Sequence, residues 1–310
     1  EHSAAVHLFD PNADSWTSVV ACELGDRPGF AWTGASLLSW AGGGLALPGN
    51  GDACAAIDGG AGADALSLDI GHTVIQAGDE MIVWGGGEPA SNVGARYNHE
   101  TGLWSQTSIS QETPTPRAGH VAAWTGQEMI VWGGGAETVT NTGGRYDPAG
   151  DTWAATSQAA ACPLGRLGGG GVWTGTRMGL WGGEGSDGAL ADGALYDPAT
   201  DSWSPISGTD APSARFGHTM VWTGSELIVW GGGHQQDAYL VELGDGAHYH
   251  PESGLWTPMP VAGAPSPRLF HTAVWTGYGM IVWGGGMEDG VVPGAPSYFA
   301  DGARYRCKAD

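Results

Sequence analysis

The stretch HTMVWTGSELIVWGGG, from His218 to Gly233, decides the fold of this 310-residue chain. Two short apolar runs, each ending in tryptophan, are separated by a turn sequence and followed by three glycines. Runs of this length that are rich in Val, Ile, Met and Trp and bounded by glycine are typical of β-strands. Because the glycine of the Trp-Thr-Gly turn can adopt a positive φ, the stretch predicts two antiparallel strands joined by a tight hairpin.

The same phrase recurs along the chain, for instance as HVAAWTGQEMIVWGGG at 120–135 and HTAVWTGYGMIVWGGG at 271–286. The glycine pair that follows the second run begins at Gly42, Gly85, Gly133, Gly182, Gly231 and Gly284. The intervals between these pairs are 43, 48, 49, 49 and 53 residues. A fixed period of this size is the signature of a repeat protein, and one supersecondary unit per repeat is expected.

A second phrase, such as ALYDPATDSW at 194–203, lies between most of these copies. In it an aromatic residue precedes a tryptophan by seven positions, in the pairs Phe9/Trp16, Tyr97/Trp104, Tyr146/Trp153, Tyr196/Trp203 and Tyr249/Trp256. All 16 tryptophans of the chain fall in three positions of the repeat, so we expect them to pack against their copies in neighbouring units. Four strands in each of about six repeats predict a β-propeller.

These motifs resemble those of the kelch-repeat proteins, of the bacterial type. The resemblance rests on the double glycine after the second strand, here Gly231 and Gly232, and on the spaced Tyr249 and Trp256 of the outer strands. It covers nearly the whole chain and implies one all-β domain over residues 1–310. That domain would be a six-bladed kelch-type β-propeller with four antiparallel strands per blade. Kelch propellers have many unrelated activities, so the resemblance implies the fold more strongly than the function.

Two parts of the chain depart from the repeat. No Tyr/Trp pair lies between Gly44 and His72, where Ile57 and Leu66 are expected to take its place. The two ends of the chain also contain two candidates for a third strand, in the segments 5–20 and 301–306, although the ring needs only one of them. The ring is expected to close through these terminal strands, and the sequence leaves open which candidate is surplus.

The net charge of −22, with Lys308 as the one lysine, limits the partners. Such a chain would repel phosphate, which excludes nucleic acids and disfavours anionic membrane surfaces. No run of 18 apolar residues is present, so membrane insertion is not expected. Cations, neutral sugars and basic proteins remain as partners, and the acidic surface also serves solubility.

The cysteines and the N-terminus bear on the compartment. The chain begins at Glu1 without an initiator methionine, as a processed product would, and its four cysteines include no CxxC pair. We therefore expect an extracellular, periplasmic or cell-surface protein. Cys22 and Cys54 both fall on one face of the first complete blade and are predicted to form a disulfide, with Cys162 free or paired with another chain.

Some connections between strands are nearly the same in every repeat, whereas others differ in length and sequence. The turns between strands one and two, and between three and four, are short and nearly invariant, whereas the connections on the opposite face vary in length. Variable loops on a rigid scaffold are where binding residues concentrate. The longest are 234–247 and 287–302, with these candidate binding residues: His234, Gln235, Gln236, Asp237, Tyr239, Met287, Glu288, Asp289, Tyr298 and Phe299. Exposed aromatics would anchor a partner, or they would pack against each other.

A second set of candidates lies where each first strand begins. Histidines share one repeat position, with arginines three positions before it, in the set His72, His120, His218, His271, Arg117, Arg166, Arg215 and Arg268. Because first strands line a propeller's channel, these residues could bind an anion or a metal at its mouth. The resemblance implies instead that they tie loops to neighbouring blades, and the distances around a ring exceed the reach of one metal ion. We favour the framework interpretation.

The metal and enzyme alternatives have weaker support. His248 and His250 flank Tyr249 and would share a strand face, where a pair can chelate a metal, but no third ligand is visible. The Asp-rich turns lack the alternating oxygen ligands of a calcium loop. The sequence thus favours a non-catalytic module that binds a protein or a glycan without a cofactor. The alternative is a sugar-acting kelch enzyme, a copper-dependent oxidase or a sialic-acid mutarotase, with copper or calcium as the possible metal.

Overall fold

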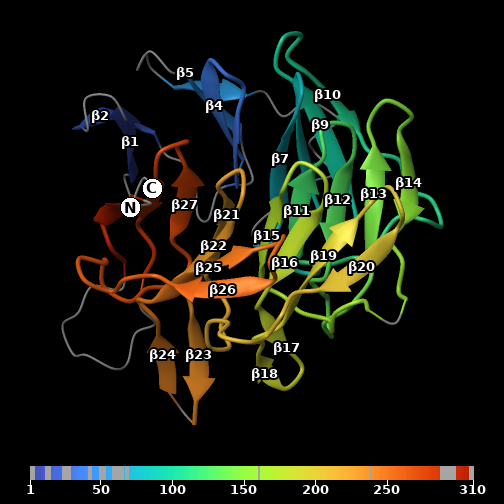
Figure 1. Cartoon of the computed structure of the whole chain (residues 1–310). Coiled ribbons are helices and arrows are strands. Elements are labelled where there is room, and N and C mark those ends of the chain that lie inside the picture. The colour runs from blue at the N-terminus through green and yellow to red at the C-terminus, as the bar shows by residue number, and fades with distance from the viewer. Residues whose placement is uncertain are drawn as a thin grey trace. The chain divides into compact units, whose positions relative to one another are not determined.

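The computed structural model describes residues 4–10, 15–22, 29–40, 44–48, 54–57, 66, 70–159, 161–237, 239–286 and 298–306 of the chain. All regular structure in these residues is β-strand (Figure 1). Within the same residues there is no helix with the length and apolar character needed to cross a membrane. The chain divides into two compact units, residues 1–131 with 144–155 and residues 132–143 with 156–310. Each unit is described by itself.

The described residues of the first unit form two complete four-stranded antiparallel sheets and a two-stranded one. The first sheet runs in the order β3 (Gly29–Trp32), β4 (Ser36–Trp40), β5 (Gly44–Pro48) and β6 (Ala55–Ile57). The second consists of β7 (Thr73–Ala77), β8 (Glu80–Trp84), β9 (Gly94–Asn98) and β10 (Leu103–Gln106). Separately, β1 (Ala4–Asp10) pairs with β2 (Ser15–Cys22). A third sheet contributes residues to both units, with β11 (Val121–Trp124), β12 (Met129–Trp132), β13 (Gly143–Asp147) and β14 (Thr152–Ala155).

In the second unit, the residues that the structure describes form three further sheets and two small hairpins. The fourth sheet consists of β15 (Gly170–Trp173), β16 (Met178–Trp181), β19 (Gly193–Asp197) and β20 (Ser202–Pro205). The fifth consists of β21 (Thr219–Trp222), β22 (Leu227–Trp230), β25 (Gly246–His250) and β26 (Leu255–Pro258). The sixth, as described, consists of β27 (Thr272–Trp275), β28 (Met280–Trp283) and β29 (Gly302–Tyr305). The hairpins are β17 (Glu184–Gly185) with β18 (Gly188–Ala189), and β23 (Gly233–Gln236) with β24 (Tyr239–Glu242).

The first sheet, whose repeat lacks the Tyr/Trp pair, differs from the prediction. Leu47 lies opposite Leu37, in the position that Tyr97 takes opposite Met81, so Leu47 and not Ile57 replaces the tyrosine. Ile57 lies on the fourth strand opposite Gly44. The prediction was wrong because the connection between the second and third strands is only three residues long here, which moves the third strand forward in the sequence.

The structure also answers the question of the surplus third strand. β29 lies antiparallel to β28, with Met280 opposite Tyr305, and it is therefore the third strand of the sixth sheet. β1 is paired with β2, where Phe9 lies opposite Trp16. Closure of the last blade by the strand of Trp16 stays a prediction.

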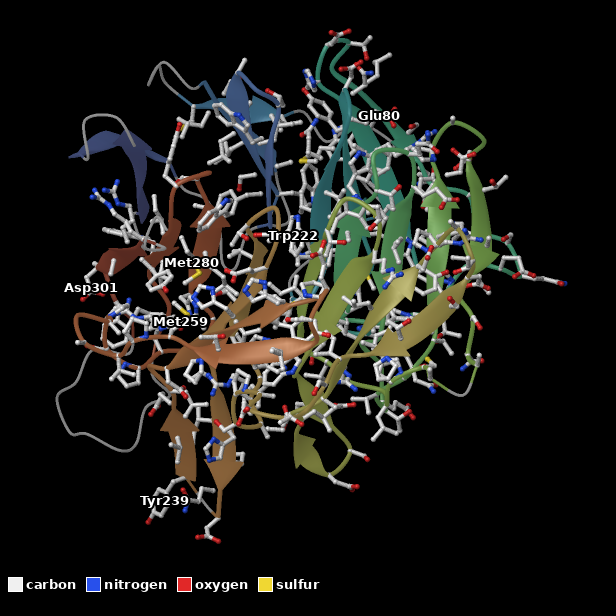
Figure 2. All side chains as sticks on the ribbon, in the orientation of Figure 1. Glu80, Trp222, Tyr239, Met259, Met280 and Asp301 are labelled. Carbon is white, nitrogen blue, oxygen red and sulfur yellow. The ribbon has the colours of Figure 1, made fainter. Side chains whose placement is uncertain are left out.

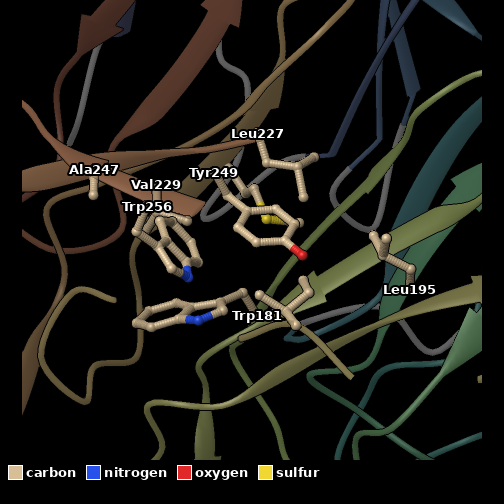
Figure 3. Close-up of a cluster of buried hydrophobic side chains, with 9 residues drawn as sticks. Trp181, Leu195, Leu227, Val229, Ala247, Tyr249 and Trp256 are labelled. Atoms are coloured by element: carbon tan, nitrogen blue, oxygen red, sulfur yellow. The ribbon is translucent and has the colours of Figure 1, made fainter. Parts of the chain in front are cut away.

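The hydrophobic core consists of clusters that join consecutive sheets. In the second unit, Trp181 of β16 packs edge-on against Trp256 of β26, with ring centroids 5.6 Å apart (Figure 3). Tyr249 lies opposite Trp256 on the neighbouring strand and belongs to the same cluster. Aromatic rings bury large apolar areas, and this explains why the repeat keeps a tryptophan at both positions.

The tryptophans of three fourth strands also make a polar contact with the preceding sheet. The indole N–H donates to a backbone carbonyl in three successive repeats, from Trp153 to Ser108 (3.1 Å), Trp203 to Ser157 (3.0 Å) and Trp256 to Ser207 (2.8 Å). Phenylalanine would bury similar area but supply no donor. The repeat therefore requires tryptophan at this position for both its area and its N–H group.

Candidate functional site

The histidines and double glycines of the repeat are two halves of one contact. In the second unit the ring of His218 sits against Gly182, where an added Cβ would come within 2.7 Å of the imidazole. His271 lies against Gly231 in the same way, at 2.6 Å. Both glycines have a positive φ as well, 62° and 68°. A side chain at either glycine would collide with the histidine of the next blade and strain the backbone.

The same histidines bond to the neighbouring blade. His120 and Thr73 share a hydrogen bond of 2.8 Å, as do His271 and Thr219. The Nε2 atom of His218 accepts a hydrogen bond from the backbone N–H of Gly170 at 3.1 Å. These side chains are buried, and the Nε2 atom of each ring is engaged by the neighbouring blade.

Burial sets the charge state of these histidines. Removal from water lowers the pKa of His120 and His218 to about 3 and that of His271 to about 4. The charge of the arginine three residues before each histidine lowers the pKa further. They are therefore neutral at physiological pH and do not attract an anion.

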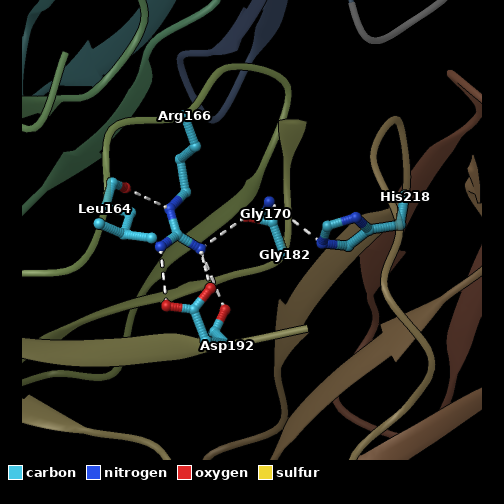
Figure 4. Close-up of polar contacts among 6 residues, drawn as sticks. All are labelled: Leu164, Arg166, Gly170, Gly182, Asp192 and His218. Atoms are coloured by element: carbon cyan, nitrogen blue, oxygen red, sulfur yellow. Dashed lines mark hydrogen bonds and ion pairs between the residues drawn. The ribbon is translucent and has the colours of Figure 1, made fainter. Parts of the chain in front are cut away.

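The arginines of the repeat point inward. Arg166 donates to the carbonyls of Leu164 and Gly182 at 2.9 and 3.0 Å, and its two terminal nitrogens grip the Asp192 carboxylate at 2.9 and 3.0 Å (Figure 4). Arg215 with Asp245 and Arg268 with Asp301 repeat this ion pair in the next two blades. Each guanidinium is buried, whereas the carboxylates are about half-exposed. The pairs fix the start of each third strand.

The sequence interpretation missed these carboxylates. Asp192, Asp245 and Asp301 each precede a glycine that opens a third strand. This recurring Asp-Gly dipeptide was the available signal.

The long connection at 234–247 is more ordered than the predicted loop. It contains the hairpin of β23 and β24, in which Gln236 lies opposite Tyr239 and Asp237 takes a left-handed φ of 56° in the turn. Leu240 is buried, which holds the hairpin to the blade. β18 contacts β23, so hairpins from two consecutive blades lie side by side at the same end of the second unit (Figure 1).

The candidate aromatics divide into two kinds. The side chain of Tyr239 points away from the unit at the tip of its hairpin and is 65% exposed (Figure 2). Tyr298, which bridges to Gly286, is 74% exposed. Phe299 instead packs against a framework residue, since the Cζ atom of Arg268 lies 4.2 Å from the centroid of the Phe299 ring.

The polar candidates on this hairpin are mostly exposed. Gln235, Gln236 and Asp237 face solvent, and His234 is half-buried. The candidates Met287, Glu288 and Asp289 lie outside the described residues.

Phe270 is an exposed aromatic that the sequence interpretation missed. It is 67% exposed and adopts a φ of 53°. Its repeat position is held in four other blades by glycines with positive φ, namely Gly71, Gly119, Gly168 and Gly217. A bulky residue in the left-handed region is a strained exception of the kind that accompanies function. Its signal in the sequence was the break in the Gly-His dipeptide, Phe-His in this copy alone.

His248 and His250 form a cluster with a carboxylate. Nδ1 of His248 lies 2.9 Å from Oε2 of Glu226, and Nε2 of His250 contacts the other oxygen of Glu226. Nε2 of His248 bonds the Tyr305 hydroxyl at 3.0 Å. His248 takes the position of an arginine, since Arg96 pairs with Glu80 and Arg145 with Glu128 in earlier blades. The predicted histidine pair is thus brought together around a glutamate.

The cysteines can be placed in part. Cys54 is disulfide-bonded, and Cys162 is a free, half-buried thiol whose Sγ lies 3.4 Å from the Asn141 carbonyl. The pairing of Cys54 with Cys22 stays a prediction, because the side chain of Cys22 is not described. Among the residues that are described, no three His, Cys, Asp or Glu side chains gather in a way that could hold a metal ion.

Comparison with known proteins agrees with this geometry. The family model described as the KLHDC2/KLHL20/DRC7 Kelch-repeats domain matches residues 71–285. The chain belongs to the kelch-repeat family, and its fold is an all-β, six-bladed β-propeller. Kelch propellers are typically protein-interaction modules. A search of curated proteins gives no match.

Proposed function

We propose that this kelch propeller is a non-catalytic module that binds a protein through the face formed by its variable connections. One observation carries the proposal: the neighbouring hairpins β17–β18 and β23–β24 extend from consecutive blades, and Tyr239 at the tip of one is 65% exposed. Exposed aromatic rings on rigid elements are the usual anchors of protein interfaces.

Further exposed aromatics belong to the same proposed face. Phe270 precedes His271 at the start of β27, and Tyr298 bridges to Gly286 just after β28. The left-handed backbone of Phe270 costs about 1 kcal/mol or more, and strain of this kind is common at functional sites. By contrast, the repeat histidines and arginines are engaged in framework bonds, which supports a module without catalysis or a cofactor.

We also propose an extracellular, periplasmic or cell-surface location. The disulfide at Cys54 supports it, because structural disulfides persist in oxidising compartments.

The proposed function is tested by selecting binders from a random peptide library displayed on phage. The selected peptides are then measured against the double variant Tyr239→Ser/Tyr298→Ser. We expect their affinity to fall at least tenfold, since aromatic anchors carry a large share of interface energy. The matched control is Tyr278→Ser, which removes a tyrosine that is 84% exposed in the turn between β27 and β28 on the opposite face. Peptides that lose affinity for the control variant instead would contradict the proposal.

A further inference from the structure

The second unit contains a pocket beside the β17–β18 hairpin. Its volume is about 570 Å³, within the range of ligand-binding pockets. One wall is the segment 137–141, which connects β12 to β13; the second is Leu164 with Gly165; and the third comes from residues 185–187 and Leu190. The pocket therefore lies among the variable connections of two consecutive blades.

Backbone hydrogen bonds hold the pocket walls in place. The Thr140 N–H donates to the Gly134 carbonyl, and the Leu190 N–H to the Gly183 carbonyl, both at 2.8 Å. Gly165 passes so close to Thr140 that an added Cβ would come within 2.7 Å of its carbonyl carbon. The pocket is thus formed before any ligand arrives.

The chemistry of the lining is acidic and lacks a cation. Glu137 and Asp187 supply two carboxylates, Thr138 and Ser186 hydroxyl groups, and Val139 with Leu164 apolar surface. Among the residues that the structure describes, no arginine, lysine or histidine is part of the lining. Within the described part of the chain, neither carboxylate makes an ion pair or a side-chain hydrogen bond, whereas Asp192 nearby is paired with Arg166.

The nearest arginine cannot neutralise this pocket. Arg166 follows Gly165 directly, but its side chain is 1% exposed and its guanidinium is saturated by two carbonyls and the Asp192 carboxylate (Figure 4). Moving it into the pocket would break its ion pair with the half-exposed Asp192 carboxylate and leave the carbonyls without their donor. Glu137 and Asp187 are both exposed, so their charges are met by water or by a positive group from outside the chain.

We infer that this pocket receives a lysine or arginine side chain of the bound protein, so that the face recognises a basic segment. This inference rests on the proposed function and names the chemistry of its partner. The aliphatic part of the side chain would lie on Val139 and Leu164, and the cationic end between Glu137 and Asp187. The net charge of −22 favours the approach of such a segment.

The test is a nuclear magnetic resonance titration of the ¹⁵N-labelled full chain with N-acetyl-arginine methylamide. N-acetyl-citrulline methylamide, which has nearly the same shape without the charge, is titrated in parallel. We expect the arginine compound to shift the amide signals of residues 138–141 and 185–187, and to bind at least fivefold more tightly than the citrulline compound. The variant Glu137→Gln/Asp187→Asn should weaken the arginine compound about tenfold, the effect of losing two partly exposed ion pairs.

The control variant Glu100→Gln/Glu252→Gln makes the same change in net charge at turns between third and fourth strands and should leave the affinity unchanged. Equal binding of both compounds, or shifts outside the pocket, would overturn the inference. If the phage-selected peptides still depend on Tyr239 and Tyr298 but not on Glu137 and Asp187, this inference fails while the proposed function stands.

Discussion

The imidazole of His271, which directly precedes β27, and the hydroxyl of Thr219 on the neighbouring strand β21 share a hydrogen bond of 2.8 Å. Burial lowers the pKa of this histidine to about 4 from an ordinary value of 6.5. The bond therefore joins a neutral ring to the neighbouring blade, and its protonation is opposed by the folded state.

The first prediction concerns acid stability. Below pH 6.5 the unfolded chain binds a proton at His271 that the folded chain does not bind, so the free energy of unfolding falls as the pH decreases towards about 4. His271→Gln should remove up to about 1.4 kcal/mol per pH unit from this slope. Urea unfolding of both proteins at about pH 7, 6 and 5 measures it. An unchanged slope in the variant would show that the histidine does not contribute.

The second prediction concerns the contact between Trp256 and the Ser207 carbonyl, 2.8 Å long. Trp256→Phe removes the donor and leaves part of the space empty, so the free energy of unfolding should fall by about 1–3 kcal/mol. Trp32→Phe is the control, since Trp32 is 49% exposed and its replacement should change stability by less than about 0.5 kcal/mol. Denaturant unfolding compares the two, and equal losses would contradict the role of the indole.

The third prediction concerns the left-handed backbone at Phe270. Phe270→Gly and Phe270→Ala both remove the ring, but only the glycine relieves the φ of 53°. The glycine variant should be more stable than the alanine variant by about 1 kcal/mol, measured from their thermal or denaturant unfolding. The reverse order would mean that the backbone relaxes when the ring is removed. If Phe270 also belongs to the binding face, both variants should bind the selected peptides more weakly.

The fourth prediction concerns the cysteines. Non-reducing peptide mapping should join Cys54 to Cys22, while Cys162 should be alkylated without reduction. The modification of Cys162 should be slow at neutral pH, because burial raises the pKa of its thiol and lowers the thiolate fraction. A peptide joining Cys162 to Cys22 would refute this assignment.

The strand pattern was predictable because it depends on local sequence. The apolar runs that end in tryptophan and the Trp-Thr-Gly turns each specify a strand or a turn without help from distant residues. The shift of the third strand in the first sheet was not predictable, since no tyrosine marks its position and the placement of Leu47 opposite Leu37 is a long-range pairing.

The candidate site was predictable in outline only. The sequence identified the variable connections and the exposed Tyr239, because that residue stands outside every framework position. It did not predict that Phe299 lies under Arg268, or that Glu226 joins His248 to His250. These contacts depend on which side chains the packed blades bring within bonding distance.

The sequence by itself determined the repeat, the fold class and the family of this protein. Glycine, tyrosine and tryptophan recur in it at a regular interval, and such an interval indicates a structural unit that is repeated along the chain. Only the tertiary structure decided which polar residues make contacts that hold the blades together and which remain available to bind a partner. Arg166 and Glu137 are both charged residues of variable connections, yet the fold buries the first in a saturated set of hydrogen bonds and leaves the second in an open pocket. That difference arises because the environment of a side chain is set by neighbours distant in the sequence, which no local pattern encodes.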